Sequence, residues 1–387
     1  MKKSFLALAV AALAATSIST ASAATVYDKD GTSLAVYGRV QAVVYSDKTG
    51  NAAEFTGRDN IMEKKATAVG SGRLGFDMRS QVYGDIAAFA KAEWDMSDGN
   101  RQSFQARYMW IGFDFAQAGQ VKLGTFEPAI KYAIGQTDIF DDWGCTGLAG
   151  NDDKREAMAQ YSWSGNGFDV IASVELPGTS VQVDGAYRLN GEDADVDYGV
   201  SLAMGYTSPD VVFGPIQVRA GYEKVNFADS TKNSFADPSG SAVSHYYDSY
   251  DQYAIGLSWG SLNLGPYVGA VYHEREFDVN GIAAGTDGYK TSVTGYEFVV
   301  GYSFANGISA RTGYLVQEYK QDDAKAEAKT VPVYVNWQLN PQVNVWAEAS
   351  FDAGTDDDQT TDGKNFATLA GANYAENFFS AGVRYQF

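Results

Sequence analysis

Three carboxylates stand close together near the middle of the chain, in the stretch TDIFDDWG at residues 137–144. Asp138, Asp141 and Asp142 are interleaved there with bulky apolar side chains, and the stretch has neither a helical nor a strand period. It belongs to a longer connection, residues 127–153, that also carries Glu127. Carboxylates gathered in such a loop attract cations through their summed field.

Arginines supply the opposite charge. Arg39, Arg73 and Arg107 each lie in a stretch where polar and apolar residues alternate, and each falls on the polar side of that alternation. An arginine side chain stays ionised at any relevant pH. The loop and the arginines would form an acidic edge opposite a basic surface if the fold brings them together.

Other chemistry has little support in the sequence. Only His245 and His273 are available as the usual base of a hydrolase, and no G-x-S-x-G block accompanies them. We interpret both as solvated histidines and expect no enzymatic activity. The acidic stretches at 190–197 and 352–363 lack the full spacing of a calcium loop, so they predict solvated outer loops, with no metal and no other cofactor.

The elements that must position these residues repeat from Leu34 onward, as about ten residues of alternating character followed by a turn. In residues 34–46, the apolar face carries Val36, Val40 and Val44, and the polar face carries Tyr37, Arg39 and Gln41. The same period of two recurs at 72–80, 308–319, 330–339 and 376–387. The whole pattern predicts about sixteen strands.

The connections between these strands alternate in length. Short turns are predicted at GD (84), AQAG (116), ANG (305) and NP (340), and long polar connections at 47–70, 127–153, 177–196, 228–248, 278–292, 320–329 and 353–373. Aromatic residues stand near strand ends, as do Tyr45, Trp94, Phe304, Trp337, Tyr385 and Phe387. Such a pattern is typical of a transmembrane antiparallel β-barrel of the bacterial outer membrane, an all-β fold with two aromatic girdles.

The start of the chain and its composition agree with export. Residues 1–23 have two lysines, a short apolar run and an A-x-A ending, which predict a cleaved signal peptide. Residues 24–387 are then expected to form a single barrel domain. Cys145 is the one cysteine, so no disulfide forms within the chain, and the net charge of −19 argues against nucleic acid as a partner.

A barrel of about sixteen strands is wide enough to enclose an aqueous channel. If the channel is to select solutes by size, part of the chain must narrow it. We expect the loop at 127–153 to fold into the lumen and to project its carboxylates into the channel. Arg39, Arg73 and Arg107 fall on the first, second and fourth strands, so they should cluster on one wall. An acidic loop facing a basic wall creates a transverse field across the gap, which favours small polar solutes.

Several short stretches of the sequence also resemble corresponding stretches of the general diffusion porins of Gram-negative outer membranes. The resemblance covers the whole mature chain, in order: residues 24–40, GRLGF (72–76), ARYMWIGFDF (106–115), TDIFDDWG and the ending AGVRYQF. It implies a homotrimer of sixteen-stranded barrels in contact with outer-membrane lipid and lipopolysaccharide, each with its third loop folded inward. The implied function is passive diffusion of ions and small hydrophilic solutes.

The resemblance also assigns residues to the pore constriction. It places Arg39, Arg73, Arg107 and Arg155 on the basic wall, and Asp138 and Asp142 on the acidic loop. This chain departs from the family at four positions: Asp141 replaces a proline, Cys145 a glycine, Thr146 an acid and Thr125 an arginine. Losing a wall arginine and gaining Asp141 should shift the selectivity toward cations.

Two alternatives remain open at this point. A substrate-specific channel, for example for sugars, would use lumenal aromatics such as Tyr37, Tyr334 and Trp346, but these form no regular ladder in the sequence. The long loops are also compatible with adhesion or phage reception, which the sequence does not test.

Overall fold

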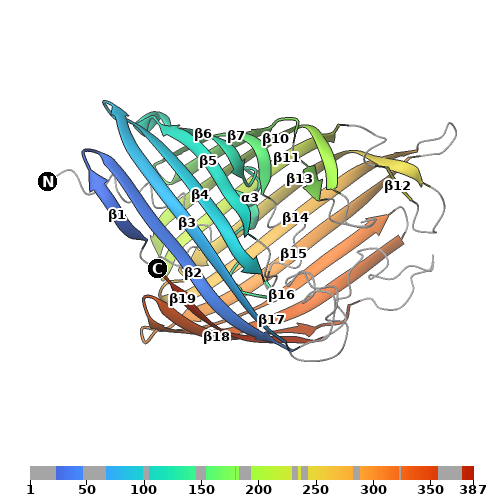
Figure 1. Ribbon diagram of the computed structural model, residues 1–387. Coiled ribbons are helices and arrows are strands. Elements are labelled where there is room, and N and C mark those ends of the chain that lie inside the picture. The colour runs from blue at the N-terminus through green and yellow to red at the C-terminus, as the bar shows by residue number, and fades with distance from the viewer. Residues whose placement is uncertain are drawn as a thin grey trace.

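The computed structural model describes residues 23–46, 67–98, 104–144, 154–178, 180–182, 193–228, 234–236, 243–281, 288–321, 324–355 and 377–387. Sixteen long strands form a closed antiparallel barrel (Figure 1). The first eight are β2 (Thr32–Tyr45), β3 (Thr67–Tyr83), β4 (Ile86–Asp98), β5 (Phe104–Asp114), β6 (Gln120–Phe126), β7 (Arg155–Gly165), β8 (Phe168–Glu175) and β10 (Asp193–Val211). The others are β11 (Gly214–Phe227), β13 (Val243–Gly260), β14 (Gly265–Gly281), β15 (Tyr289–Ser303), β16 (Ile308–Gln321), β17 (Ala324–Asn340), β18 (Val343–Asp352) and β19 (Phe378–Gln386).

Each long strand pairs with the next, and the last closes the barrel on the first. The β19–β2 ladder runs from Ser380 opposite Tyr45 to Gln386 opposite Arg39. Three short strands complete the sheet: β1 (Ala24–Lys29), β9 (Ser180–Gln182) and β12 (Ser234–Ala236). The described residues also form two short helices, η1 (Ala116–Ala118) and α3 (Lys131–Ile134), neither of which has the length or apolar character needed to cross a membrane.

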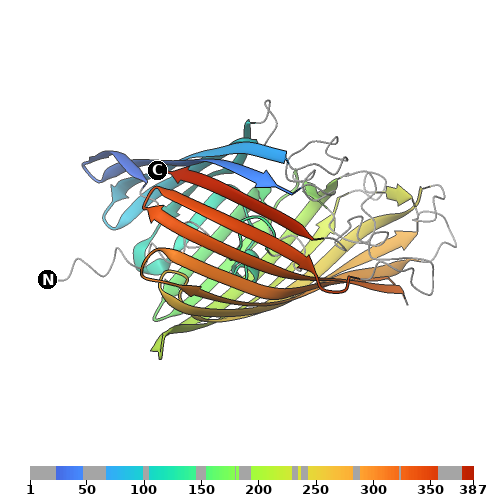
Figure 2. The ribbon, with the colours of Figure 1, turned by 90° about the horizontal axis from the view of Figure 1, so that it is seen from below.

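The short connections lie together at one end of the barrel, next to the C-terminus (Figure 2). The four predicted turns are confirmed at this end. The β7–β8 turn shows the local cause, because Asn166 and Gly167 have positive φ angles of 53° and 84°. An Asn-Gly pair tolerates this conformation and matches the twist of the flanking strands.

One predicted connection is wrong. Residues 320–329 were expected to form a long polar loop, but β16 and β17 continue through them, with Gln321 opposite Ala324. The segment AKAEAKT keeps the period of two, so that Ala326 and Ala328 are buried between outward charged residues. Alanine and charged residues have low strand propensity, which is why composition suggested a loop where the pattern predicts a strand.

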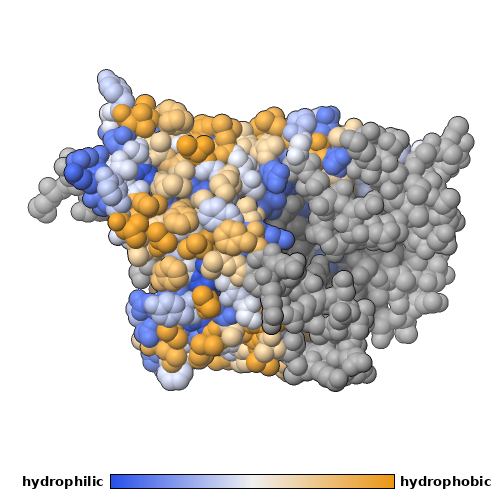
Figure 3. Space-filling view, viewed as in Figure 1, coloured by the Kyte–Doolittle hydropathy of each residue, from blue (hydrophilic) through white to orange (hydrophobic). Residues whose placement is uncertain are grey.

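The two faces of the strands differ as the alternation predicts. Outward positions such as Val40, Val44, Ile255 and Leu257 are exposed and apolar, and Figure 3 shows apolar residues spread over the outer surface of the barrel. Phe304, Trp337, Tyr385 and Phe387 are exposed aromatics near strand ends, as a girdle requires. Tyr45 is an exception: its side chain is buried on the inward face, so its assignment to a girdle is wrong.

Candidate functional site

The described part of the predicted inner loop, segment 127–144, packs closely against the inward face of the barrel. Four inward glycines on β10, β11, β13 and β14 make this approach possible; we call Gly205, Gly221, Gly256 and Gly269 the glycine track. A Cβ atom at Gly256 would lie 2.5 Å from the carbonyl oxygen of Ala133, and one at Gly205 would lie 2.7 Å from Cε1 of Tyr132. A side chain on the glycine track would meet the backbone of segment 130–136 at Gly221, Gly256 and Gly269, and the Tyr132 ring at Gly205.

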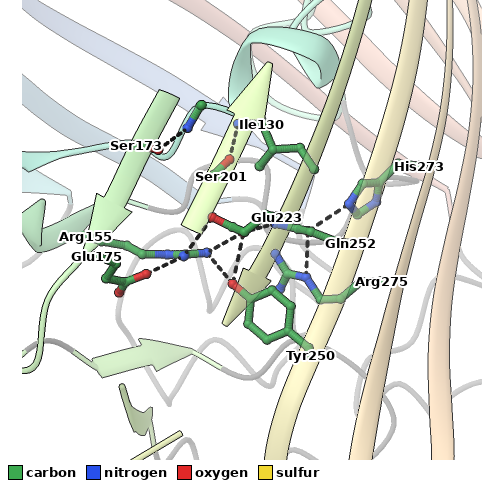
Figure 4. Close-up of polar contacts among 11 residues, drawn as sticks. Ile130, Arg155, Ser173, Glu175, Ser201, Glu223, Tyr250, Gln252, His273 and Arg275 are labelled. Carbon is green, nitrogen blue, oxygen red and sulfur yellow. Dashed lines mark hydrogen bonds and ion pairs between the residues drawn. The ribbon is translucent and has the colours of Figure 1, made fainter. Parts of the chain in front are cut away.

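Polar groups on the same strands hold the beginning of the segment. The backbone N–H of Ala129 donates to Ser173 Oγ and that of Ile130 donates to Ser201 Oγ, each over 2.9 Å (Figure 4). Further along, Gln136 Nε2 donates to Ser258 Oγ over 2.9 Å. The first two bonds satisfy backbone donors just before the short helix α3 that would otherwise be buried without partners, and the third holds a side chain just after it.

Glu348 on β18 holds the other end of the segment. Its Oε2 accepts the backbone N–H groups of Asp141 and Asp142, each over 2.9 Å, and its Oε1 accepts that of Trp143 over 2.6 Å. The ring of Trp143 stacks on Phe378, with ring centroids 5.0 Å apart. The carboxyl group of one residue therefore accepts hydrogen bonds from three consecutive residues of the acidic stretch.

Asp142 does not project into open space as the sequence suggested. Its side chain is 8% exposed and accepts hydrogen bonds from Ser380 Oγ (2.5 Å), Trp346 Nε1 (2.9 Å) and the Tyr45 hydroxyl (3.1 Å). Burial raises the pKa of Asp142 above its ordinary value, against the effect of its hydrogen bonds. The expectation that Asp142 faces a channel is therefore wrong: it ties the segment to the wall.

Asp138 and Asp141 remain partly accessible, but each has a positive partner. Asp141 Oδ1 lies 2.7 Å from Arg384 Nη2 on β19, and its Oδ2 accepts from the Tyr334 hydroxyl over 2.6 Å. Burial alone would raise the pKa of Asp141, but the Arg384 charge and these hydrogen bonds hold it below its ordinary value. Asp138 lies 3.7 Å from Lys131 Nζ within the same segment.

Three of the predicted arginines meet on one wall. Arg39 on β2 stands directly opposite Arg73 on β3, and Arg73 and Arg107 share a carboxylate partner on β4. A register shift between β4 and β5 leaves Arg107 as an extra residue in its strand, and such a bulge re-aims a side chain. The fold thus brings together residues that the sequence separates by as many as 68 positions, counted from Arg39 to Arg107.

Two carboxylates that the sequence analysis did not single out stand between these arginines. Asp95 accepts Arg73 Nε at Oδ1 over 3.0 Å and Arg107 Nη1 at Oδ2 over 2.8 Å. Glu93 accepts Arg107 Nε over 3.0 Å and the Tyr37 hydroxyl over 2.8 Å. Their spacing of two residues in AEWD places both on the same face as the arginines, a signal the sequence does contain.

Arg155 belongs to a different cluster. Its guanidinium contacts Glu175 Oε2 (2.7 Å), Glu223 Oε1 (3.1 Å) and the Tyr250 hydroxyl (2.6 Å), and its side chain is fully buried (Figure 4). Gln252 extends the cluster by bonding Glu223 on one side and His273 and Arg275 on the other. We call these seven residues the Arg155 network. Its position on β7, β8, β11, β13 and β14 separates Arg155 from the other three predicted arginines.

His273 was expected to be solvated, and that expectation is wrong. The side chain is fully buried, and Nε2 lies 3.0 Å from Gln252 Oε1. The side chain of His245 lies outside the described residues, as do Cys145 and residues 356–363 of the second acidic stretch. In the first acidic stretch, residues 193–197 belong to β10, with Ala194 and Val196 buried, so the prediction of a solvated outer loop is wrong for these residues. Across the described residues, no group of histidine, cysteine and carboxylate side chains is placed to hold a metal ion.

The aromatic residues considered for a sugar channel also have other contacts. Tyr334 and Trp346 bind Asp141 and Asp142, and the Tyr37 hydroxyl binds Glu93. Tyr334 and Trp346 are almost completely buried. Their faces are therefore not arranged as a stacking surface for a solute.

Comparisons with known proteins give the chain its family. A family model described as Gram-negative porin matches residues 7–358. The outer membrane protein Omp-EA of Erwinia amylovora is 25% identical over 340 residues, which cover 83% of this chain and 84% of that protein. The outer membrane porin protein OmpD of Salmonella typhimurium strain LT2 is 26% identical over 412 residues, with both chains fully covered.

Solved structures support the same fold. The structure of Salmonella typhi OmpF in complex with daunomycin superimposes with a TM-score of 0.69 at 18% identity, covering 94% of this chain and all of that one. The trimer form of Vibrio cholerae OmpT gives a TM-score of 0.62 at 17% identity, covering 92% of this chain and all of that one. Together with the closed barrel and its apolar outer surface, these matches identify the chain as a member of the Gram-negative porin family, located in the outer membrane.

Proposed function

We propose that this porin forms a water-filled channel for passive diffusion of ions and small hydrophilic solutes, with a preference for cations. In this proposal, segment 127–144 lies in the lumen and narrows it. The channel acts without catalysis and without a cofactor, and the chain is exported by a signal peptide at residues 1–23.

The observation that carries the proposal is that the same strands have an apolar outward face and a charged, partly hydrated inward face. Outward side chains are apolar, whereas the inward charged groups of β2–β5 keep contact with water: the side chains of Arg73, Arg107 and Asp95 are 22%, 18% and 31% exposed. Charged groups that stay hydrated on the inner face of a closed barrel are those expected of a channel lining.

Segment 127–144 supports the proposed narrowing. It contacts inward residues from β8 and β10 at its beginning and from β18 and β19 at its end, so it extends across several strands of the inner face. Its fixed position on the wall gives the opening a defined width. Solutes are then selected by size and charge rather than by a binding pocket.

We further propose that the protein assembles as a homotrimer in contact with outer-membrane lipid and lipopolysaccharide. The Vibrio cholerae OmpT structure is described as a trimer form, which supports this assembly for a chain of the same fold. The band of exposed apolar residues on the outer face supports the contact with lipid.

Swelling of proteoliposomes tests the proposed diffusion. Vesicles containing the refolded barrel should swell in isotonic solutions of small uncharged solutes, at rates that fall with solute size and do not saturate with concentration. Uptake that saturates for one sugar would instead favour the substrate-specific channel. Vesicles that fail to swell in every solute would contradict the proposed pore.

A further inference from the structure

Four side chains form a patch on the inner wall of three neighbouring strands, β4, β5 and β6 (Figure 1). Phe89 and Lys91 alternate in step with the inward Glu93 on β4. Trp110 lies directly opposite Lys91, and residues directly opposite each other share one face of a sheet. Lys122 belongs to the same face, because it pairs with the same residue of β5 as Phe89 does. We call Phe89, Lys91, Trp110 and Lys122 the lysine–aromatic patch.

Lys122 is the cation of this patch that has capacity for a further partner. Its side chain is partly exposed, and its Nζ lies 4.1 Å from the centroid of the Phe126 ring and 5.3 Å from that of Trp110. Within the described part of the chain, Lys122 has these ring contacts and no ion pair with a carboxylate. A lysine ammonium carries three hydrogen-bond donors, and its bonds to a carboxylate are charge-assisted. The ammonium of Lys122 therefore suits an anion that arrives from the channel.

Lys91 is a weaker candidate for binding an anion. Its Nζ lies 3.4 Å from Asp77 Oδ1 and 4.8 Å from the centroid of the Tyr37 ring. The Asp77 side chain is 48% exposed, so water screens this ion pair. Because Lys91 already has a carboxylate beside it, we expect Lys122 to be the main anchor for an anion and Lys91 to assist it.

Aromatic rings stand directly beside the Lys122 side chain. Phe89 and Trp110 meet edge to face, with ring centroids 5.3 Å apart, and both remain partly exposed. Gly112 separates Phe89 from Lys122, and a Cβ atom there would lie 3.0 Å from each of these two side chains. The ring and the lysine stem therefore adjoin without an intervening side chain. An inorganic anion would use the ammonium alone, whereas an organic anion with a flat ring would also cover the aromatic surface.

We propose that the lysine–aromatic patch is a binding site for small aromatic carboxylates, an inference that rests on the proposed pore. The carboxylate accepts hydrogen bonds from the ammonium of Lys122, and the ring packs against Trp110 and Phe89. The patch lies on the wall of the channel, so binding delays the solute without ending its diffusion. The pore would then retain this class of anion longer than other anions of similar size.

Broadening of benzoate proton signals in NMR spectra of the detergent-solubilised protein measures this binding without any ion flux. Benzoate should bind more tightly than acetate, which lacks the ring, and more tightly than benzamide, which lacks the charge. Lys122→Gln should weaken benzoate binding by about tenfold, as expected for the loss of a hydrogen bond between charged groups. Lys122→Arg keeps the charge and should retain most of the binding.

The aromatic part of the site has its own variant. Trp110→Leu removes the ring that faces both Phe89 and the Lys122 ammonium. It should weaken the binding of benzoate and leave the weak binding of acetate unchanged. An equal effect on both anions would show that the ring of the solute has no contact with this wall, which would overturn the proposal.

Lys290→Gln is the matched control for the loss of a lysine charge. Lys290 is on β15, where its side chain is 63% exposed and its Nζ pairs with Glu276. Removing this charge should leave benzoate binding unchanged. A loss of binding equal to that in Lys122→Gln would mean that benzoate responds to net charge alone, which would also overturn the proposal.

The remaining outcomes separate the site from the pore. Benzoate binding that survives Lys122→Gln in a barrel with normal heat-modifiable migration on gels would refute the site, as would equal binding of benzoate and benzamide. Failure of the proposed pore is a different result, because it shows as an absence of conductance in planar bilayers, and the NMR titration does not depend on conductance.

Discussion

Arg384 and Asp141 are separated by 243 positions in the chain, yet Nη2 of the arginine lies 2.7 Å from Oδ1 of the aspartate. The arginine is on β19, the strand that closes the barrel, and the aspartate belongs to segment 127–144. This ion pair connects the proposed constriction to the closing strand. We therefore expect docking of the segment and closure of the barrel to be coupled.

Replacing Asp141 by asparagine should weaken that coupling in a pH-dependent way. Because the pKa of Asp141 is lowered in the folded protein, its stabilising contribution is present above its ordinary pKa of 3.8 and is lost as the pH falls through the lowered value. At pH 7 the free energy of unfolding of the variant should be lower by about 1.5–3 kcal/mol, as expected for the loss of hydrogen bonds to a charged group. Thermal unfolding in detergent at pH 7 and pH 3 measures this, and an equal difference at both pH values would contradict it.

Asp142 should behave in the opposite sense. Its pKa is raised in the folded protein, so its contribution favours folding at low pH and declines as the pH rises through the raised value. At pH 7, Asp142→Asn should therefore lower the free energy of unfolding less than Asp141→Asn does, provided that asparagine keeps the hydrogen bonds from Ser380 and Trp346. The same unfolding series compares the two variants, and a larger loss at pH 7 for Asp142→Asn would refute this assignment.

Loss of the Glu348 carboxylate should loosen the end of segment 127–144. Glu348→Ala removes the acceptor of three backbone N–H groups and leaves these donors without it. The expected result is a single-channel current with larger open-state noise and a wider spread of conductance steps. Glu274→Gln is a suitable control, because Glu274 bonds Tyr253 and Tyr272 on the outward face. Quiet, uniform steps in Glu348→Ala would mean that other contacts suffice to hold the segment.

Filling the glycine track should displace the segment from the wall. A methyl group at Gly256 has no room beside the Ala133 carbonyl, so Gly256→Ala should move α3 inward and reduce single-channel conductance. Gly70→Ala provides the control, since a Cβ there meets only a carbonyl oxygen at 4.0 Å. Unchanged conductance in folded Gly256→Ala would show that the strand yields rather than the segment.

The Arg155 network should contribute to stability rather than to selectivity. Arg155→Met leaves Glu175 and Glu223 buried without the guanidinium, a change that costs about 3–5 kcal/mol for a broken buried pair. Refolding yield and the unfolding midpoint should both fall, and Arg155→Lys should restore part of the loss. A variant with normal stability and an altered reversal potential would instead place Arg155 in the conducting path.

The barrel itself is well predicted from the sequence because the period of two places each side chain on a face before any contact is known. Arg39, Arg73 and Arg107 were placed on the inward face in this way, and strand order then brought them together. The same rule extends to Glu93 and Asp95, which alternate in step with Arg73 opposite them. Their partnership with arginines required the register of neighbouring strands, which the period alone does not give.

What covers an inward face is not encoded in that period. Asp142 and Tyr45 both carry polar atoms, and nothing in their own stretches indicates that they bond each other in a buried site. His273 is followed in the sequence by Glu274 and Glu276, yet those acids lie on the outward side of the strand while the imidazole is buried beside Gln252. Such contacts depend on where segment 127–144 and distant strands meet, so they emerge only from the three-dimensional arrangement.

The most direct test of a cation-preferring pore is electrical. Purified mature protein is added to a planar bilayer under a salt gradient, and conductance steps are recorded together with the reversal potential. We predict persistent open steps that close in thirds and a potential of the sign expected for cation selectivity. A folded barrel that never conducts would contradict the account.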